Sequence, residues 1–259
     1  MTIQAIVMYS GGIGSWAAGM RAVERYGQAH TTLLFCDTKM EDEDLYRFLH
    51  DGAAVIGVPV TTIADGRTPW EVFHDERYLG NTKVGLCTRV LKQEVRDRWL
   101  RQHYSPEECL CLMGMDFCQK EATRLTKMQT LSAPYQVEAP LFWNPPMDKD
   151  LAKLWALKMG LRLPRLYALG FQHNNCGGGC VKAGQEQWAT LYRTLPERYA
   201  LHMAHEDALR ATLGKDVSIL RDRQGGRTRP LTLREFADRL DTSPELPFAE
   251  SEDSCDCFA

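Results

Sequence analysis

The sequence has no long apolar run, no excess of charge of either sign and no internal repeat. A membrane-spanning helix needs about 18 or more consecutive apolar residues, so we expect no transmembrane segment and no membrane partner. Lys and Arg number 31 against 34 Asp and Glu, a net charge of -3 at pH 7, so overall charge indicates no nucleic-acid partner. The first residues, MTIQAIVMYSGG, lack the basic and apolar regions of a secretion signal. We therefore expect a cytoplasmic protein.

The chain has 259 residues, of which 44% are hydrophobic and 25% are charged. This composition is typical of a globular protein with a substantial core, organised as one large domain or as one domain with an appendage. Nine cysteines are too few for a disulfide scaffold, and their odd number leaves at least one unpaired. In a reducing compartment, clustered cysteines more often bind metals or carry redox chemistry.

Short apolar runs alternate with amphipathic stretches through the first half of the chain. The apolar runs, at residues 3–9, 31–36, 58–63 and 109–113, predict strands. The amphipathic stretches, at residues 16–26, 45–56, 86–102 and 119–128, predict helices. This alternation predicts an α/β fold, a parallel sheet with helices on both faces, whose ligands bind beyond the carboxyl ends of the strands.

We predict three parts along the chain: an α/β domain over residues 1–140, a helical cysteine-bearing region over residues 141–240, and a flexible acidic tail over residues 241–259. The tail holds six acidic residues, two prolines and no basic residue. Six arginines precede it, Arg221, Arg223, Arg227, Arg229, Arg234 and Arg239. With Lys182 they could bind the phosphates of a polynucleotide, or they are solvated or paired with the tail.

A glycine-rich loop, Ser10-Gly11-Gly12-Ile13-Gly14-Ser15, lies between the first predicted strand and the first predicted helix. Glycines at this place let backbone N–H groups converge on an anion, and the helix N-terminus adds positive potential. The loop matches neither the dinucleotide nor the Walker A pattern. It is either a phosphate-binding loop or a plain glycine-rich turn.

The same loop resembles the SGGxDS signature of the PP-loop ATP pyrophosphatase superfamily, with Gly14 where Asp is usual. Asp37-Thr38, followed by Tyr46 and Arg47, resembles the superfamily's DTG segment. Residues 114–117 with Glu121 and Arg124 resemble its G-x-R-x-x-E segment, with Asp116 in place of arginine. Residues 140–143 and 166–171 resemble the stretch that leads into its cysteine motif. The similarity spans residues 5–180 and is greatest to the phosphoadenylyl-sulfate and adenylyl-sulfate reductases and their relatives.

This resemblance implies an adenine nucleotide alpha hydrolase-like fold that binds ATP or a related adenine nucleotide. The glycine-loop residues Ser10, Gly11, Gly12, Gly14 and Ser15 are then expected to bind the nucleotide. Asp37 and Thr38 could bind Mg²⁺ or a ribose hydroxyl; the alternative is helix capping. Arg89, Lys92 and Arg124 could face the phosphates, or they are solvated surface cations.

Cys176-Gly-Gly-Gly-Cys180 is the most informative local motif, because three glycines permit a sharp reversal that turns two thiolates toward one centre. An iron–sulfur cluster is the natural occupant. Zinc is a second candidate, although no other Cys or His pair completes a typical zinc spacing, and two merely buried or surface cysteines are a third. The segment around Cys87 resembles a ligand segment of adenylyl-sulfate reductases. The resemblance thus implies Cys87, Cys176 and Cys180 as three ligands of a 4Fe-4S cluster.

Cys255 and Cys257 stand near the end of the acidic tail. They could supply the fourth cluster ligand or act as a catalytic thiol on a mobile segment, or they belong to an unordered end. His173, Asn174 and Asn175 could donate hydrogen bonds to cluster sulfurs or to substrate, or they shape a turn. Cys36, Cys109, Cys111 and Cys118 lie in or near predicted strands and are assigned no chemistry.

Three functions follow from these expectations. The first is an iron–sulfur PP-loop enzyme that binds ATP, activates an acceptor such as a nucleic-acid base by adenylylation, and transfers sulfur to it from a donor. The second is a reductase of adenylyl sulfate or phosphoadenylyl sulfate that uses a thiol reductant. The third is a non-catalytic nucleotide and redox sensor, which Gly14 would favour if the missing Asp disables catalysis. The sequence is compatible with an oligomer in each case.

Overall fold

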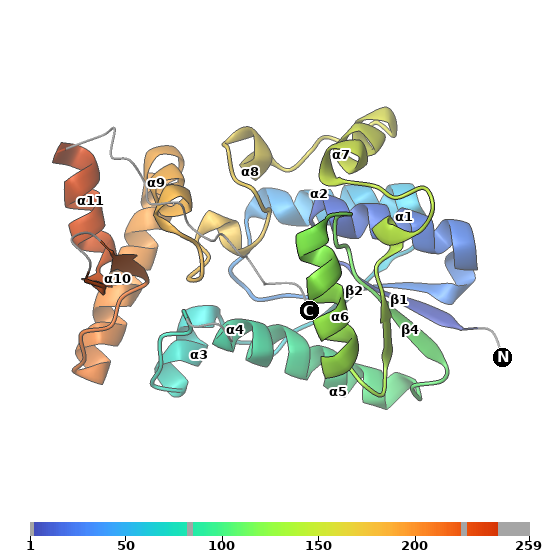
Figure 1. The fold of residues 1–259 in the computed structure, drawn as a ribbon, viewed down its shortest axis with the longest axis horizontal. Coiled ribbons are helices and arrows are strands. Elements are labelled where there is room, and N and C mark those ends of the chain that lie inside the picture. Colours follow the sequence, from blue (N-terminus) through green and yellow to red (C-terminus); the bar gives the residue numbers. More distant parts are fainter. Residues whose placement is uncertain (1–2, 82–84, 224–226, 243–259) are drawn as a thin grey trace.

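The computed structural model describes residues 3–81, 85–223 and 227–242. A five-stranded sheet lies in one half of the molecule, and α9, α10 and α11 lie at the other end (Figure 1). Every strand pairing in this sheet is parallel, and the strands lie in the order β3-β2-β1-β4-β5. The strands are β1 (Gln4–Met8), β2 (Thr31–Cys36), β3 (Val60–Ile63), β4 (Cys109–Leu112) and β5 (Gln136–Glu138). The predicted α/β fold is confirmed, with β5 as a strand that the sequence analysis did not single out.

Helices separate and follow these strands. The helices are α1 (Ile13–Tyr26), η1 (Gln28–His30), α2 (Glu43–Ile56), α3 (Pro69–Asp75), α4 (Leu86–Thr88), η2 (Arg89–Gln93), α5 (Glu94–His103), α6 (Gln119–Leu131), η3 (Pro140–Phe142), α7 (Lys149–Lys158), α8 (Arg165–Ala168), η4 (Cys176–Gly178), α9 (Gln185–Thr194), α10 (Pro196–Leu213) and α11 (Leu233–Thr242). None of those in the described residues is long and apolar enough to cross a membrane.

Alternate residues of β1 enter two different cores, as the two-residue period of a strand requires. Ala5 and Val7 pack with residues of α1, α2 and α7 on one face of the sheet. Ile6 and Met8 pack with residues of α5 and α6 on the other face. Since both faces are covered by helices, the central strands are almost fully apolar.

The helix predicted at residues 86–102 is present, but it contains an irregularity. Its middle part, η2, is a π-helical turn between α4 and α5. Turns of this kind are often found at functional sites, because the extra residue bulges the backbone and re-aims neighbouring side chains. Here the turn contains Arg89 and Lys92, two of the cations predicted to meet phosphates.

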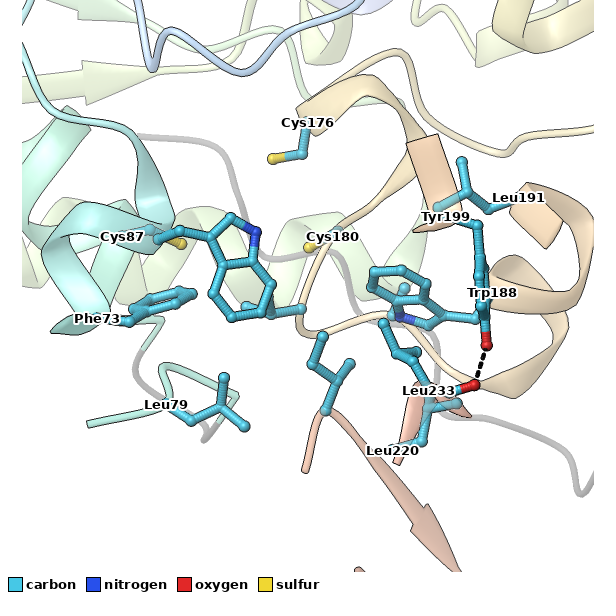
Figure 2. Packing of buried hydrophobic residues seen from close by; sticks show 14 of the residues in the cluster. Phe73, Leu79, Cys87, Cys176, Cys180, Trp188, Leu191, Tyr199, Leu220 and Leu233 are labelled. Atoms are coloured by element: carbon cyan, nitrogen blue, oxygen red, sulfur yellow. Dashed lines mark hydrogen bonds between the residues drawn. The ribbon is translucent and has the colours of Figure 1, made fainter. Parts of the chain in front are cut away.

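The packing crosses the division predicted at residue 140. A third core, which we call the cysteine core, combines apolar residues from 70–91 with others from 166–240. Cys87, Cys176 and Cys180 all belong to it (Figure 2). In the other direction, α7 packs on α1 of the α/β part, where Trp155 meets Trp16 edge to face. Each half of the chain therefore completes a core that the other half begins.

The C-terminal region differs in detail from the prediction. Part of the arginine-rich stretch forms an antiparallel hairpin, β6 (Leu220–Asp222) with β7 (Arg229–Leu231). Arg229 and Arg239 both pair with Asp222, and Arg234 pairs with Asp207, so these cations have local acidic partners. Residues 241–242, assigned to the tail, are the last residues of α11.

Candidate functional site

The glycine loop lies where the order of the strands reverses. The chain runs from β1 outward to β2 and β3, then returns to place β4 on the other side of β1. In open α/β sheets, ligands bind in the crevice at such a switch point, beyond the carboxyl ends of the strands. Gly14 follows β1 and Gly114 follows β4, and the two backbones touch at this crevice: a Cβ added to Gly14 would lie 2.5 Å from the Gly114 carbonyl oxygen.

A pocket opens at this crevice. Its lining comes from the glycine loop, from the loop after β4, from the start of α6 and α7, and from the segment before the cysteine motif. The lining residues are Ser10, Gly12, Ile13, Gly14, Gly114, Asp116, Glu121, Lys149, Tyr167, His173, Asn174 and Asn175. Three of the five predicted loop residues, Ser10, Gly12 and Gly14, thus line a common pocket.

Each glycine of the loop is required, or tolerated, for a different structural reason. Gly11 has a φ of +74°, and a Cβ there would also lie 2.8 Å from the Leu45 side chain. Gly14 already belongs to α1, where its missing side chain permits the contact with Gly114. At Gly12, in contrast, a Cβ would have no neighbour closer than 3.7 Å. Gly12 is therefore the position where a side chain would enter the pocket without first displacing the protein.

The remaining predicted loop residue, Ser15, lies buried in the first turn of α1 and donates its hydroxyl to the Gly12 carbonyl at 2.8 Å. The N–H of Ile13 donates to the Tyr167 hydroxyl at 3.3 Å, so one N-terminal donor of α1 already has a protein partner. Ser15 thus holds the turn in shape and is not among the residues that line the pocket.

Asp116 stands over the position where Gly14 lacks a side chain. A Cβ at Gly14 would lie 3.3 Å from an Asp116 carboxylate oxygen. The structure therefore brings together the two positions at which this chain departs from the superfamily pattern. Burial raises the pKa of Asp116, nearby Lys149 and Lys153 oppose the shift, and Glu121 and Asp148 add to it.

Lys149 supplies positive charge to the pocket, and sequence reasoning missed it. It donates to the carbonyl of Gln172, and its ammonium nitrogen lies 5.5 Å from the centre of the Tyr167 ring. No motif marked this lysine, because it is placed by the packing of α7 onto α1 and not by local sequence.

Asn174, singled out as a hydrogen-bond donor or a turn residue, holds the glycine loop directly. Its side-chain amide donates to the Gly11 carbonyl at 2.9 Å. Its carbonyl oxygen is buried and has no hydrogen-bond partner among the described residues. A buried acceptor without a partner is costly, so this atom is suited to accept a hydrogen bond from a ligand.

Asp37 and Thr38 follow β2 as predicted, but their side chains are occupied within the protein. Asp37 accepts hydrogen bonds from the Lys39 ammonium and the Tyr46 hydroxyl, both at 2.8 Å. Burial by itself raises the pKa of Asp37, but these hydrogen bonds outweigh it and lower the pKa overall. Neither residue lines the pocket. The helix cap of α2 is Asp42, so capping does not explain Asp37.

The three predicted phosphate ligands are dispersed. Arg89 is half exposed and lies 3.8 Å from Glu94. Lys92 is buried, with its ammonium nitrogen 3.9 Å from Glu41. Arg124 pairs at 3.2 Å with Glu121, which itself lines the pocket. None of the three cations is among the pocket's lining residues.

Glu41, which sequence reasoning missed, connects the segment after β2 with the cysteine loop. This buried carboxylate accepts a hydrogen bond from the Thr38 hydroxyl at 3.0 Å and another from the backbone N–H of Cys176. It also faces Lys92. Thr38 and Lys92, two predicted nucleotide ligands, are thus joined through Glu41 to the first cysteine of the loop. Only the acidic run before α2 signalled this residue.

The cysteine loop needs its glycines for close packing as well as for chain reversal. A Cβ at residue 177 would lie 1.5 Å from an Arg198 nitrogen, and one at residue 179 would lie 2.0 Å from the Nε2 atom of His202. Cys176 itself has a φ of +53°, a backbone conformation that residues other than glycine rarely adopt. The loop is therefore an unusual, tightly enclosed turn whose shape packing enforces.

The three predicted cluster ligands come together in the cysteine core. Figure 2 shows Cys87, Cys176 and Cys180 in this core, contributed by α4 and by the two ends of the glycine turn. All three are buried, and no disulfide joins the seven cysteines of the described residues. Within those residues, no three His, Cys, Asp or Glu side chains lie close enough to hold a single metal ion. Cys255 and Cys257 lie outside the described residues.

His202, on α10, borders this loop. Burial, and to a smaller extent Arg198 and His205, lower the pKa of His202 to about 3, so its imidazole is neutral. The indole N–H of Trp70 donates to the Nδ1 atom of His202 at 3.1 Å. Its Nε2 atom has no hydrogen-bond partner among the described residues. Sequence reasoning had no signal for this histidine, because it lies far from the motif along the chain.

No protein-family model matches the chain. No curated protein sequence matches it either. Among solved structures, the chain is similar to phosphoadenylyl-sulfate (PAPS) reductase from Candida auris, solved as a phosphate complex. The TM-score is 0.45 and 14% of aligned residues are identical, over 64% of this chain and 78% of that chain. Similarity at this level does not assign an activity, and the α/β assignment stands on the observed sheet.

Proposed function

We propose that this protein is an enzyme that binds an adenine nucleotide in the glycine-loop pocket and performs sulfur chemistry on it. One observation carries the proposal: a three-residue segment joins the two predicted sites. At one end of the segment, Asn174 donates to the Gly11 carbonyl of the glycine loop. At the other end, Cys176 begins the thiol-bearing turn and donates its N–H to Glu41. The cysteine turn therefore begins directly after residues that line the pocket.

The pocket has groups that complement an adenine nucleotide. The N-terminus of α1 and the Lys149 ammonium favour phosphate or sulfate oxygens. The unpartnered carbonyl oxygen of Asn174 suits an amino or hydroxyl donor of the base or ribose. Because Asp37 is occupied by Lys39 and Tyr46, a Mg²⁺ ion that accompanies the phosphates would meet Asp116 and Glu121 instead.

The cysteine core fits the 4Fe-4S cluster that the resemblance implies. Three buried cysteines belong to this core, and the Nε2 atom of His202, which has no partner among the described residues, can donate a hydrogen bond of the kind that cluster sulfurs accept. A cluster also separates its cysteine ligands more widely than a single ion does. Cys87, Cys176 and Cys180 would hold the cluster, which when bound supplies a redox-active centre with one iron open to a further ligand.

The reaction we favour is thiol-dependent reduction of adenylyl sulfate or phosphoadenylyl sulfate. A thiolate attacks the sulfate sulfur, the sulfur–oxygen bond to the nucleotide breaks, and the nucleotide leaves as a phosphate. A second thiol then attacks the enzyme sulfur, releasing sulfite and forming a disulfide. Cys255 and Cys257 are the nucleophiles we propose. Among the described residues that line the pocket, Lys149 is the one lysine or arginine, which suits a phosphosulfate better than the more highly charged triphosphate of ATP.

ATP-dependent sulfur transfer, for example to a nucleic-acid base, is the second candidate. The observation in its favour is the pair of carboxylates, Asp116 and Glu121, at the pocket. A Mg²⁺ ion held there would add the positive charge that a triphosphate requires. The sensor hypothesis loses its motive, because Gly14 is explained by contact with Gly114 and not by the loss of a function.

Product analysis separates the two reactions. The protein, purified without oxygen, is incubated with a thiol and either adenylyl sulfate, phosphoadenylyl sulfate or ATP. Sulfite released from a sulfonucleotide supports the reductase, whereas pyrophosphate released from ATP with an acceptor present supports sulfur transfer. The absence of both products, together with the absence of nucleotide binding by calorimetry, would overturn the proposed function.

Gly12→Val tests whether the pocket holds the nucleotide. The structure leaves room for a Cβ at this position, so the variant should fold, while its larger side chain fills the space that phosphates would use. We expect nucleotide affinity to fall at least a hundredfold, measured by calorimetry. Thr123→Val, on the exposed side of α6, is the matched control and should bind as the parent does. Equal affinity in the Gly12 variant would show that the loop is only a turn.

A further inference from the structure

The histidine beside the cysteine loop carries an inference that goes beyond the proposed reaction. His202 is 2% exposed and lies among aromatic side chains, with Trp188 meeting its ring edge to face at 5.2 Å. A buried imidazole ordinarily satisfies both nitrogens. Here only Nδ1 has a partner among the described residues, the indole of Trp70.

The bond from Trp70 fixes where the proton of the imidazole lies. An indole nitrogen can only donate, so Nδ1 of His202 must accept. In a neutral imidazole the other nitrogen then carries the hydrogen. Nε2 is therefore a hydrogen-bond donor, held in a defined tautomer by a partner on α3.

The position of Nε2 shows what this donor faces. A Cβ at Gly179 would lie 2.0 Å from Nε2, so the nitrogen occupies the space beside the glycine turn. Cys176 and Cys180 are the two ends of that turn, and both are buried in the same core as His202's neighbours Trp70 and Trp188. A buried donor that has no partner among the described residues, beside the turn that connects two cysteines, is suited to a sulfur acceptor that is added to the protein.

We propose that His202 is a positioning residue that donates its Nε2–H to a sulfur atom, a thiolate or a sulfide, of the group held by the cysteine loop. Trp70 sets the tautomer that makes this possible. The inference rests on the proposed cluster and adds a function for α10 and α3. A hydrogen bond to sulfur stabilises the more electron-rich, reduced form of the group and raises its reduction potential.

Three variants separate the hydrogen bond from packing. His202→Leu keeps apolar bulk and removes the donor, whereas His202→Gln keeps an N–H donor. Trp70→Phe keeps an aromatic ring and removes the bond that sets the tautomer. His205→Leu is the control, because His205 stacks on Trp70 at a 5.2 Å ring separation but is not the residue that meets Gly179.

The protein is purified without oxygen, and iron, sulfide and the reduction potential are measured. We expect His202→Leu to retain iron and to shift to a lower potential, with a fraction of reduced protein roughly tenfold lower at a fixed solution potential. His202→Gln should have a reduction potential close to that of the parent, and Trp70→Phe should have an intermediate potential. His205→Leu should match the parent. Double-resonance spectra in H₂O and in D₂O should differ by an exchangeable proton coupled to the reduced group, which is present in the parent and in His202→Gln and missing in His202→Leu.

The outcomes distinguish the inference from the function on which it rests. A parent protein without iron and sulfide would overturn the cluster, and the inference with it. A loaded parent whose potential and exchangeable proton are the same in His202→Leu would overturn the inference alone. If His202→Leu fails to fold, His202→Gln and Trp70→Phe decide: an unchanged potential and proton coupling in Trp70→Phe contradicts the role of the tautomer.

Discussion

The glycine loop after β1 and the cysteine loop before α9 both depend on glycine, but for different reasons. In the first loop, Gly14 makes room for another segment of backbone, and Gly12 leaves open space toward a pocket. In the second, each glycine makes room for a side chain of the protein itself, including those of Arg198 and His202. The first loop thus leaves space beside its backbone, whereas the space beside the second is filled by the protein's own side chains.

The largest effect should come from Gly114→Ala, which tests the backbone contact at the crevice. A Cβ there would lie 2.4 Å from the backbone nitrogen of Ser15, and backbone cannot rotate away as a side chain can. We expect the free energy of unfolding to fall by about 3 kcal/mol in urea titrations. Gly12→Ala, with no such contact, is the control and should stay within about 0.5 kcal/mol of the parent. Similar stability of the two variants would contradict the distinction drawn between these glycines.

Gly179→Ala should have a smaller effect, confined to the cysteine loop. Its Cβ would collide with the ring of His202, which can give way by moving α10 slightly. We expect a loss of about 2 kcal/mol in unfolding free energy, release of iron, and nucleotide affinity within twofold of the parent. Iron analysis and calorimetry on one preparation would test this. A variant that loses nucleotide and keeps iron would reverse the roles we assign to the two loops.

Glu41→Gln tests the connection between the loops. The amide has the shape of the carboxylate but lacks the negative charge that faces Lys92. It also has one acceptor oxygen instead of two, so it cannot accept from both the Thr38 hydroxyl and the Cys176 N–H. We expect the unfolding free energy in urea titrations to be about 1.5 kcal/mol lower than in the parent. Removal of iron should change the nucleotide affinity of the parent severalfold and leave that of the variant unchanged. Glu43→Gln, exposed in the first turn of α2, is the control. Affinity that depends equally on iron in all three proteins would show that Glu41 does not connect the sites.

Asp116→Asn should have the smallest effect, and it depends on pH. Burial raises the pKa of Asp116, so the folded protein favours the protonated carboxyl. The stability that this group contributes is present below its unfolded pKa, near 4, and is lost as pH rises through the higher folded pKa. The Asn variant should therefore melt at a higher temperature than the parent at pH 7, and the difference should close toward pH 4. A difference independent of pH would contradict this assignment.

The strands β1, β2 and β4 and the helices α1, α2 and α6 were predictable, because their apolar periodicity is strong and local. The helix α3 was missed although its signal was present: Thr68 and Glu71 form a capping box at the start of Pro69–Asp75. The strand β5 has three residues, too few to show a period. Motif reasoning singled out the glycine loop, part of which lines a pocket, and three cysteines that belong to one core; their predicted ligands stay predictions.

The groups that sequence reasoning missed, Glu41, Lys149 and His202, are placed by tertiary packing. Each meets its partner across a long separation in sequence, as Trp70 meets His202 and Cys176 meets Glu41. Residue type suggested Arg89 and Arg124 as phosphate ligands. In the structure they form ion pairs with the nearby Glu94 and Glu121 and are not among the residues that line the pocket. Local pattern indicates which chemistry a segment can perform, whereas only the fold decides which partner it meets.

The cysteine core also determines when this protein can mature during synthesis. Residues 70–91 leave the ribosome long before residues 166–240, yet each segment supplies apolar surface that only the other covers. Domains that depend on such distant contacts fold late, after most of the chain has been made. The part of the core around Cys87 is therefore incomplete until Cys176 and Cys180 have been synthesised. A ligand that needs all three side chains in place can bind only after that point.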